Sequence, residues 1–437
     1  MYLPENITRC IQALEQAGFS AYAVGGCVRD ARLGLTPHDY DLCTNALPED
    51  TVRVFSPYTL VRSGEKHGTI GVVMNGKVIE ITTFRTEGGY QDNRHPDWVR
   101  FVSALEEDLA RRDFTVNAMA YNPKTGYIDP FGGYADLQNK ILRTVGDPAS
   151  RFTEDALRIL RGVRFAVRFG LAPEEKTQQA MVSLAPLMEN LARERVFGEL
   201  CKLLPLVTAK DLLRFAPVLT AAIPELAPTV DFLQHTPHHA YDVFTHTALV
   251  TAGVGNDLAL RWAALLHDAG KPGAFTLDED GRGHFKGHAH LSAEIADSVL
   301  RRLKASTALR EEVVLLIRQH MTPLEPDKRI LRRRLGQYGV ETVYKMLTLQ
   351  KADFAGKGVV DSDPQFSQTE ALLEEILQEE ACFSLKDLAI NGQDLIAIGY
   401  APGPAIGKCL ATLLEQVLDE TTPNEKDILL QNAKAFL

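Results

Sequence analysis

The hydrophobic pattern of this chain changes near Thr153, and that change limits what the chain can fold into. Before it, short runs rich in β-branched and aromatic residues alternate with Gly, Pro and Asn, which is typical of strands joined by turns. These runs are 22–28, 69–76, 77–84 and 126–131. After it, apolar residues recur with a period near 3.6, which predicts amphipathic helices. These segments are 154–169, 192–204, 258–270, 293–304 and 309–320. We therefore predict an α+β head followed by an all-α remainder.

The length of the chain predicts several domains. At 437 residues it is too long for one core, and about 100–200 residues per domain implies roughly three. Pro- and Gly-containing stretches near 227–239 and 357–364 indicate boundaries. We predict a head over 1–145, a helical neck over 146–230, a body over 231–360 and a helical tail over 361–437.

The charge of the chain does not exclude RNA as a partner. The formal net charge of −10 argues against a generally basic coat, but RNA affinity depends on local basic stripes. Arginines recur at three- and four-residue spacing over 158–168, and a second basic cluster covers 328–334. For each, the alternative is a solvated helix face.

The apolar runs and the cysteines of the chain bear on its cellular compartment. No run of about 18 apolar residues occurs, so we predict no membrane span. The six cysteines are scattered without a CxxC pair, and we expect free thiols in a reducing cytoplasm.

Two aspartates, Asp39 and Asp41, follow a Gly25-Gly26 turn. Residues i and i+2 of a strand project to the same face, so we expect both carboxylates to meet at one point. Converging carboxylates repel unless a cation joins them, and oxygen-only ligands suit Mg²⁺. A Gly-Gly turn lets backbone N–H groups approach a phosphate closely. The combination indicates metal-assisted nucleotidyl transfer, whereas the aspartate pair alone is equally compatible with a turn that binds nothing.

Two further segments supply matching side chains. Glu80 lies within an apolar, strand-like run, where an unpaired carboxylate is costly; we favour a third metal ligand over an edge-strand residue facing water. Arg111 and Arg112 precede Asp113 and Asn117. Arginine forks bind phosphate bidentately, which fits a triphosphate clamp, and Asn117 would contact sugar hydroxyls. The alternative is a capped helix start with surface salt bridges.

The segment from Thr153 to Arg158 has a structural and a functional interpretation. Structurally, Thr153 would cap a helix and Asp155 would form an i,i+3 ion pair with Arg158. Functionally, the pairing edges of cytosine and adenine each present an amino donor beside a ring-nitrogen acceptor, and uracil and guanine present the reverse. A carboxylate only accepts hydrogen bonds and a guanidinium only donates them. One Asp/Arg pair could therefore accept C and A and reject U and G without a template.

Five motifs occur in a fixed order between residues 20 and about 200. They are Gly25-Gly26-x-x-Arg29-Asp30, Asp39-x-Asp41, Arg111-Arg112-Asp113-Phe114-Thr115-x-Asn117-Ala118, Glu154-Asp155-x-x-Arg158 and Arg193-Glu194-Arg195-Val196-x-x-Glu199. Their order and spacing resemble those of class II CCA-adding enzymes, the tRNA nucleotidyltransferases. The resemblance implies a polymerase-β-like nucleotidyltransferase head, a neck that selects nucleotides, and a body and tail that grip tRNA.

The same resemblance implies an activity and its residues. The activity is template-independent addition of C, C and A to the 3′ end of tRNA from CTP and ATP, with Mg²⁺ in the head. Asp39 and Asp41 would be the catalytic metal ligands. The implied nucleotide-binding residues are Gly26, Arg29, Arg112, Asp113, Asn117, Asp155, Arg158, Arg161 and Arg164. The polar, Gly-rich segment 85–96 resembles a loop that enzymes adding only CC lack, which favours full CCA addition over addition of A alone.

Further along, histidines and aspartates follow a second family pattern. His246, His267, Asp268, His288, His320 and Asp353 stand in the H…HD…H…H…D order of the HD phosphohydrolase superfamily, a resemblance that spans about 235–355. Imidazole with carboxylate suits a divalent transition metal such as Mn, Co, Ni or Fe. Lys271, close after His267-Asp268, is a candidate phosphate ligand. His238, His239, His284 and His290 receive no role and are expected in loops or at the surface.

The second resemblance implies phosphodiesterase or phosphatase activity on small nucleotides or 2′,3′-cyclic phosphate ends. The alternative is a helical scaffold that keeps the ligands without useful turnover. A rival interpretation of the whole chain is a metal-dependent HD phosphohydrolase whose head only binds nucleotides. The intact head motifs disfavour it, because a non-catalytic head need not keep every catalytic residue type.

Overall fold

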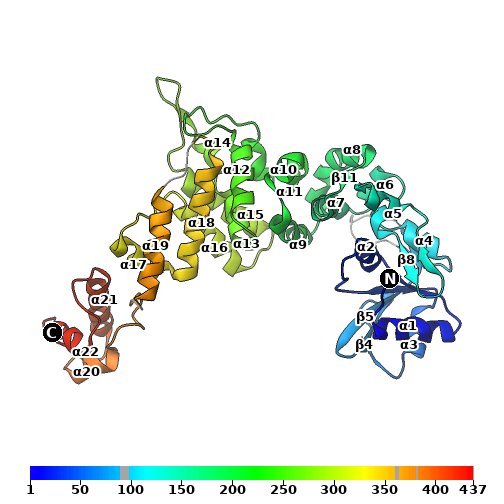
Figure 1. Ribbon diagram of the computed structural model, residues 1–437, viewed down its shortest axis with the longest axis horizontal. Coiled ribbons are helices and arrows are strands. Elements are labelled where there is room, and N and C mark those ends of the chain that lie inside the picture. Colours follow the sequence, from blue (N-terminus) through cyan, green and yellow to red (C-terminus); the bar gives the residue numbers. More distant parts are fainter. Residues whose placement is uncertain (89–97, 360–363, 380–381, 437) are drawn as a thin grey trace. The chain divides into compact units, whose positions relative to one another are not determined.

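The computed structural model describes residues 1–88, 98–359, 364–379 and 382–436 (Figure 1). These residues form two compact units. The first, here the head unit, comprises 1–207, 214–227 and 302–305, and the second, here the helical unit, comprises 208–213, 228–301 and 306–437. The segment 85–96 was the basis for favouring full CCA addition over addition of A alone. Its residues 89–96 lie outside the described residues, so this preference stays a prediction.

A seven-stranded sheet forms the centre of the head unit, in the order β3-β4-β5-β2-β1-β8-β9. Its strands are β1 Ala21–Val24, β2 Asp41–Thr44, β3 Thr59–Val61, β4 Thr69–Met74, β5 Lys77–Thr83, β8 Ala120–Asn122 and β9 Gly126–Ile128. Neighbouring strands are antiparallel except β2 and β5, which run parallel with Leu42 opposite Ile81. This parallel register places Asp41, the first residue of β2, beside Glu80, which lies within β5.

Short helices accompany the strands of the sheet along the chain. They are α1 Glu5–Gln16, α2 Gly26–Arg32, α3 Pro48–Val54, α4 Leu105–Ala110 and α5 Gly133–Gln138, and a separate hairpin pairs β6 Arg85–Gly88 with β7 Trp98–Phe101. The predicted strand over 22–28 is wrong in its second half, which is helix α2. Gly25 has a positive φ of 77° and turns the chain out of β1 into α2, a conformation that glycine tolerates at low cost.

The rest of the head unit is helical. Its elements are α6 Pro148–Glu154, α7 Leu157–Phe169, α8 Glu175–Ser183, α9 Arg193–Leu203 and α11 Ala216–Ala222, with β10 Ile141–Leu142 paired parallel to β11 Ala172–Pro173. Helix α7 lies against Phe114, whose ring centroid is 5.9 Å from that of Phe165. Gly162 allows this approach, because a Cβ there would lie 3.0 Å from the Phe114 ring.

The helical unit is built from helices that follow one another along the chain. They are α12 Val243–Gly253, α13 Leu258–Leu266, α14 Lys271–Ala274, α15 His288–Arg302, α16 Thr307–Gln319, α17 Lys328–Tyr338, α18 Val340–Gly356 and α19 Pro364–Gln378. Helix α12 packs against α13 and α18, and α13 packs against α16. At the α12–α18 contact, a Cβ on Gly356 would lie 2.8 Å from Val250 and 3.3 Å from the His246 ring. Only glycine permits this approach without displacing neighbours.

Three helices at the C-terminal end enclose a small core of their own (Figure 1). They are α20 Gly392–Ala397, α21 Pro404–Leu418 and α22 Lys426–Lys434, and Leu395, Leu413 and Leu429 are fully buried between them. The basic cluster on α17 faces acids of the same unit: Arg332 pairs with Glu379 at 2.7 Å and Arg333 with Asp419 at 2.8 Å. These two arginines therefore serve internal ion pairs.

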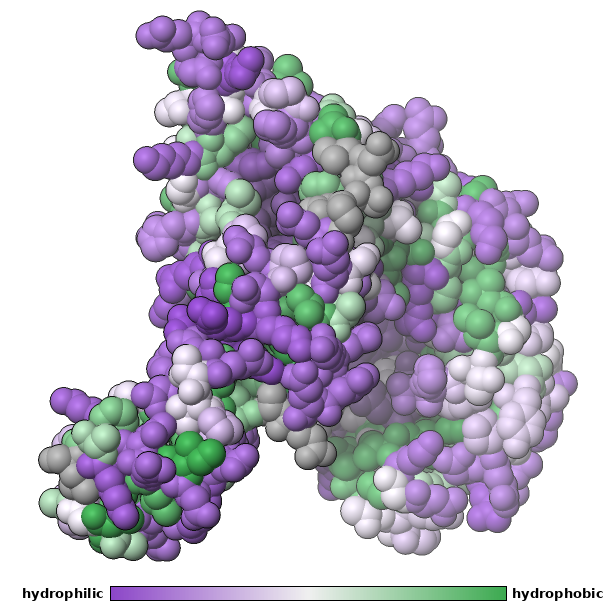
Figure 2. Space-filling model, turned by 60° about the vertical axis from the view of Figure 1, so that its left-hand side comes forward, coloured by the Kyte–Doolittle hydropathy of each residue, from purple (hydrophilic) through white to green (hydrophobic). Residues whose placement is uncertain are grey.

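Hydrophilic side chains cover most of the face shown in Figure 2, with apolar side chains in scattered patches. Among the helices of the described ranges, none is long and apolar enough to cross a membrane.

Candidate active site and a second metal-ligand cluster

Three carboxylates lie on or just before two interior strands of the head sheet, β2 and β5. Asp41 is the first residue of β2, and the parallel register with β5 brings Glu80 beside it. Asp39 precedes the strand rather than belonging to it, so the predicted two-residue alternation along a strand is wrong, although all three side chains are exposed to a ligand. Partial desolvation raises the pKa of Asp41; Arg112 opposes this, and Glu80 and Asp39 add to it. The negative charges therefore act on one another, and a hard divalent cation would relieve their repulsion. Their ligand atoms do not form a group within 4.8 Å of one another in the described structure, so the predicted meeting of the carboxylates at one point is not seen there.

Arg112 lies between the glycine turn and these carboxylates. A Cβ on Gly25 would lie 2.8 Å from its Nη1 atom, so the guanidinium rests against the bare turn. Asp108 orients the pair of arginines, with Arg111 at 2.9 Å and Arg112 at 3.6 Å. This arrangement directs the Arg112 guanidinium toward the Gly25 turn, where a phosphate would be bound.

A buried hydrogen-bond network lies behind the turn. Asp113 accepts from Arg161 Nη2 at 2.6 Å and from Asn117 Nδ2 at 3.0 Å, and Arg29 donates to Asn117 Oδ1 at 2.5 Å. Burial by itself raises the pKa of Asp113, but Arg161, Asn117 and Arg158 outweigh it and lower the pKa to about 2. Both carboxylate oxygens are engaged, so Asp113 holds Asn117 and Arg161 in place. Asn117 and Arg29 remain the members of this network nearest the turn.

The predicted base-selecting residues have different partners from those expected. Helix α6 is capped by Asp147, whose side chain accepts from Ser150, and Thr153 lies within that helix, so the predicted Thr153 cap is wrong. Asp155 is extended, with φ −146° and ψ 101°, and separates α6 from α7. Because of this break, Asp155 does not pair with Arg158. Asp155 binds Arg195 at 2.8 Å and Arg158 binds Glu154 at 2.5 Å.

Helix α9 supplies two positioning residues that had no assigned role. Arg195 holds Asp155, and one turn later Glu199 pairs with Arg164 at 2.6 Å, with both side chains at most 10% exposed. The spacing of four places both on one face of α9 toward α7. The fifth sequence motif contains Arg195 and Glu199 at this spacing. Their partners could not be read from it, because Asp155 and Arg164 lie 40 and 35 residues away in the sequence. Arg161 and Arg164 are thus held by Asp113 and Glu199.

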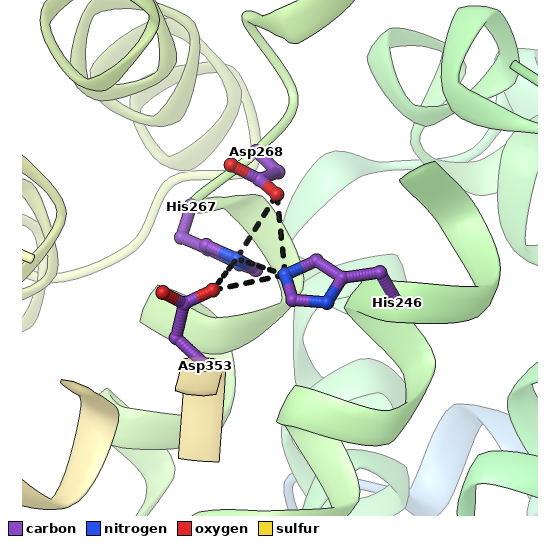
Figure 3. A group of neighbouring side chains, drawn as sticks. All are labelled: His246, His267, Asp268 and Asp353. Atoms are coloured by element: carbon purple, nitrogen blue, oxygen red, sulfur yellow. Dashed lines mark hydrogen bonds and ion pairs between the residues drawn. The ribbon is translucent and has the colours of Figure 1, made fainter. Parts of the chain in front are cut away.

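The histidine–aspartate array closes into a compact cluster in the helical unit. Figure 3 shows His246 of α12, His267 and Asp268 after α13, and Asp353 of α18 pointing toward one another. His246 Nε2 lies 2.9 Å from Asp353 Oδ1 and 3.3 Å from both Asp268 Oδ2 and His267 Nε2. All their ligand atoms lie within 4.8 Å of one another. Four residues from three helices meet as the sequence order predicts.

The other two predicted ligands, His288 and His320, form a second group with Asp268. His288 Nε2 lies 3.4 Å from Asp268 Oδ1, and Asp268, His288 and His320 form a second group within 4.8 Å. The buried Nε2 atom of His288 has no hydrogen-bond partner, whereas Asp268 Oδ2 is ion-paired with Lys271 at 2.7 Å. Burial lowers the pKa of His320 to about 4, which favours the neutral, metal-ligating form. The donor set and its unsatisfied nitrogen fit a divalent transition metal. In the described part of the chain, these are the two groups of three or more His, Cys, Asp or Glu residues whose ligand atoms lie within 4.8 Å of one another.

Lys271 and His239 lie beside this cluster. Lys271 Nζ is 2.7 Å from Asp268 Oδ2 and 2.8 Å from Gln234 Oε1, and it lies 3.4 Å from His239 Nε2. The His239 ring meets that of His246 edge to face, with centroids 5.0 Å apart. His239 lies in a loop, as predicted, but it is half-buried rather than at the surface, because this loop folds over the array. Nothing in its local sequence distinguished it from exposed His238.

Comparison with known proteins gives a consistent result. The model for the poly(A) polymerase head domain matches residues 21–143, that for the polymerase A RNA- and SrmB-binding site matches 170–228, and that for tRNA nucleotidyltransferase domain 2 matches 285–433. CCA-adding enzymes of Latilactobacillus sakei and Streptococcus mutans are 34% and 36% identical, over 97% and 98% of this chain and 96% and 97% of theirs.

Solved structures agree. The crystal structure of the Bacillus stearothermophilus CCA-adding enzyme in complex with CTP has a TM-score of 0.76 and 31% identity, and the match covers 100% of this chain and 98% of that one. The Thermotoga maritima CCA-adding enzyme complexed with tRNA shares the fold at a TM-score of 0.60 and 23% identity, over 98% and 94% of the two chains.

Proposed function

The chain belongs to the CCA-adding enzymes, and on that premise we propose that it adds C, C and A to the 3′ end of tRNA from CTP and ATP without a template. The observation that carries the proposal is the negative charge of Asp39 and Glu80 that acts on Asp41, with Arg112 nearby at the Gly25 turn. Full-length relatives that bear the name CCA-adding enzyme favour complete CCA addition over addition of A alone.

Family membership implies a divalent metal, and we propose Mg²⁺ held by Asp39 and Asp41, with Glu80 as a third ligand. When bound, the metal would lower the pKa of the attacking 3′ hydroxyl and neutralise charge on the triphosphate. The protein side chains act around it. Arg112 would bind phosphate oxygens, Asn117 would contact the sugar, and Arg29 would orient the Asn117 amide.

We propose that Asp155 and Arg158 select the base. Their separate partners support this role, because Arg195 and Glu154 hold the acceptor and the donor as two fixed, independent groups. A base that offers a donor to Asp155 and an acceptor to Arg158 satisfies both, as cytosine and adenine do. Uracil and guanine would oppose donor to donor and acceptor to acceptor.

Transcripts of tRNA ending before CC, after CC and after CCA, each incubated with one labelled nucleotide, test the proposal. We expect CMP addition to the first, AMP addition to the second and none to the third. Asp41→Asn should abolish incorporation while tRNA still binds in a filter assay. The matched control is Asp50→Asn, a half-buried head carboxylate on α3 that is ion-paired with exposed Arg53, and it should retain full activity. Addition of AMP but not CMP would instead establish an A-adding enzyme.

For the helical unit we propose a second activity, hydrolysis of phosphate esters. The observation that favours it is the convergence of six predicted metal ligands beside Lys271. The assay is hydrolysis of 2′,3′-cyclic AMP with added Mn²⁺, Co²⁺ or Ni²⁺. His267→Ala should abolish turnover, and His290→Ala, which removes an exposed histidine, should not. Turnover that is equal in His267→Ala and the unsubstituted chain would exclude the array as the active site.

We propose a cytoplasmic location, because the proposed substrate is tRNA and all six cysteines are free thiols. The predicted domain limits at 145, 230 and 360 likewise stay proposals, as does a tRNA-binding role for the tail.

A further inference from the structure

We propose that the head unit binds a phosphate of the tRNA acceptor strand at Arg32. This residue is the last of α2 and lies outside the five sequence motifs and the proposed nucleotide site. With Tyr121 of β8, Tyr127 of β9 and Tyr134 of α5 it forms what is here called the arginine–tyrosine stack. The choice of tRNA as the partner rests on the proposed function, but the presence of an anion site does not.

Two tyrosine rings hold the Arg32 guanidinium in place. Its central carbon lies 3.9 Å from the centroid of the Tyr127 ring and 3.8 Å from that of Tyr134, so the group lies between them. Tyr121 is directly opposite Tyr127 in the β8–β9 register and extends the stack, with ring centroids 4.8 Å apart. All four residues are half-buried. Cation–π contacts of this kind are worth about 0.5–1 kcal/mol each near a surface, and they fix the guanidinium without neutralising its charge.

The charge of Arg32 has no carboxylate partner among the described residues. Its side chain forms no ion pair or hydrogen bond with any of them, and its buried Nε atom is unsatisfied. The acids on the neighbouring segments are engaged elsewhere. They are Asp30, which pairs with Arg29 at 2.7 Å, Asp129, which accepts from two backbone N–H groups at the start of α5, and Asp136, which pairs with Arg143 at 3.2 Å. A half-buried cation without an internal partner favours an anion from solution.

The arginine–tyrosine stack suits the phosphate of a nucleic-acid strand. Because the rings fix the plane of the guanidinium, its N–H donors keep a constant direction and can bind two phosphate oxygens at once. Aromatic side chains beside a positive charge are typical of sites for single-stranded nucleic acid, where a base or sugar rests on the ring. A protein carboxylate would also fit the guanidinium. RNA is favoured because the proposed substrate brings phosphates to the head in every round of addition.

Helix α2 connects the stack to the proposed nucleotide site. It begins with Gly26 at the glycine turn and ends with Arg32, which lies about 9 Å further along the helix at a rise of 1.5 Å per residue. A nucleic-acid strand rises about 3.4 Å per nucleotide, so this distance corresponds to about two to three nucleotides. With the 3′ hydroxyl bound near the turn, Arg32 would contact a phosphate about that far before the end of the acceptor strand.

The test measures tRNA binding to the full-length chain in the absence of nucleotide. A transcript that ends after CC is titrated in a filter assay between about 50 and 200 mM KCl. Arg32→Gln should weaken binding about tenfold, because a charge-assisted contact is lost. The slope of log affinity against log salt should become shallower by about 0.7–0.9, the contribution of one phosphate. The matched control is Arg9→Gln, an exposed head arginine whose partner Glu5 lies on the same helix; it should change neither quantity.

A neutral linkage in the RNA identifies the phosphate. A short acceptor-stem hairpin carries one methylphosphonate, which is uncharged, at each of its last four linkages in turn. One of these replacements should weaken binding to the parent chain as much as Arg32→Gln does, and it should cause no further loss in Arg32→Gln. This thermodynamic cycle assigns that phosphate to Arg32. Arg32→Lys, which keeps the charge but not the planar fork, should restore the salt slope and only part of the affinity. Circular dichroism confirms that each variant is folded.

Unchanged affinity and salt slope in Arg32→Gln would overturn the inference and leave a protein carboxylate as the occupant of the stack. An equal loss in Arg9→Gln would also overturn it, because only net charge would then matter. Failure of the inference is distinguishable from failure of the proposed function. If the parent adds nucleotides and Arg32→Gln binds tRNA equally well, only the inference is refuted. If the parent adds none and Arg32→Gln still weakens tRNA binding as expected, only the proposed function is refuted.

Discussion

The carboxylate of Asp113 organises the interior of the head, so we predict that Asp113→Asn lowers both stability and activity. Asparagine keeps the shape and can still accept a hydrogen bond from Asn117, but it removes the charge that faces Arg161 at 2.6 Å. The Asp113 side chain is only 8% exposed, so water cannot replace the lost ion pair. The guanidinium then loses its compensating charge.

The magnitude follows from the protonation equilibrium. The pKa of Asp113 falls from 3.8 to about 2 in the folded chain, which corresponds to about 2 kcal/mol in favour of the folded, ionised form. Because the folded pKa lies below the unfolded one, this stabilisation is complete above about pH 4 and disappears as the pH falls toward 2. The destabilisation by Asp113→Asn should therefore be the same at pH 5 and pH 7.

Urea unfolding at both pH values, followed by far-ultraviolet circular dichroism, measures the effect. A double-mutant cycle with Arg161→Gln isolates the pair, and its coupling energy should be about 2 kcal/mol. Nucleotide incorporation should fall with Asp113→Asn at temperatures where the variant is folded, because a neutral amide oxygen holds Asn117 less firmly than the carboxylate does. A coupling energy near zero, or a loss of stability at pH 7 that vanishes at pH 5, would refute the argument.

Three further substitutions test the site. Gly25→Ala, which places a Cβ 2.8 Å from Arg112 in a backbone with φ 77°, should cost about 1–3 kcal/mol and abolish incorporation; normal turnover would show that Arg112 can move away freely. Glu199→Gln removes the partner of Arg164 at 2.6 Å and should lower stability by about 3 kcal/mol in thermal or urea unfolding, so an unchanged midpoint would contradict a buried ion pair. Arg195→Gln releases Asp155 and should increase misincorporation of UMP and GMP about tenfold at unchanged tRNA affinity, since about 1.4 kcal/mol of positioning is lost; unaltered selectivity would exclude a positioning role.

Local patterns in the sequence predicted part of the secondary structure. Runs rich in β-branched residues predicted β4 and β5, and runs with a period of 3.6 predicted α9, α13 and α16, because burial of one face determines that period. The predicted helix over 154–169 was wrong at Asp155, where the chain becomes extended. No residue of low helix propensity other than Asp155 itself signals this break. Contacts with α9 hold it, and those contacts depend on the tertiary fold.

Site residues were predictable where they follow a known motif. The ligands of the array were recognised because their order resembles that of the HD phosphohydrolase superfamily, and imidazole with carboxylate suits a transition metal. Their division into two groups was not visible, because ligand order along the chain does not state which oxygen of Asp268 faces which ring. His239 and Gln234 were missed for a related reason: a loop residue gains its role from where the loop folds.

The separate partners of Asp155 and Arg158 make the selectivity of the head easier to explain than a direct pair would. An Asp155–Arg158 pair would satisfy itself, and any base would have to break it. Held by Arg195 and Glu154, the two side chains keep a fixed acceptor and a fixed donor that cannot rotate to suit a wrong base. An unsatisfied group in such a site costs about 1–3 kcal/mol, so a base with the reversed pattern would be rejected at two positions at once. Rigid support from α9, rather than a template, would then distinguish C and A from U and G.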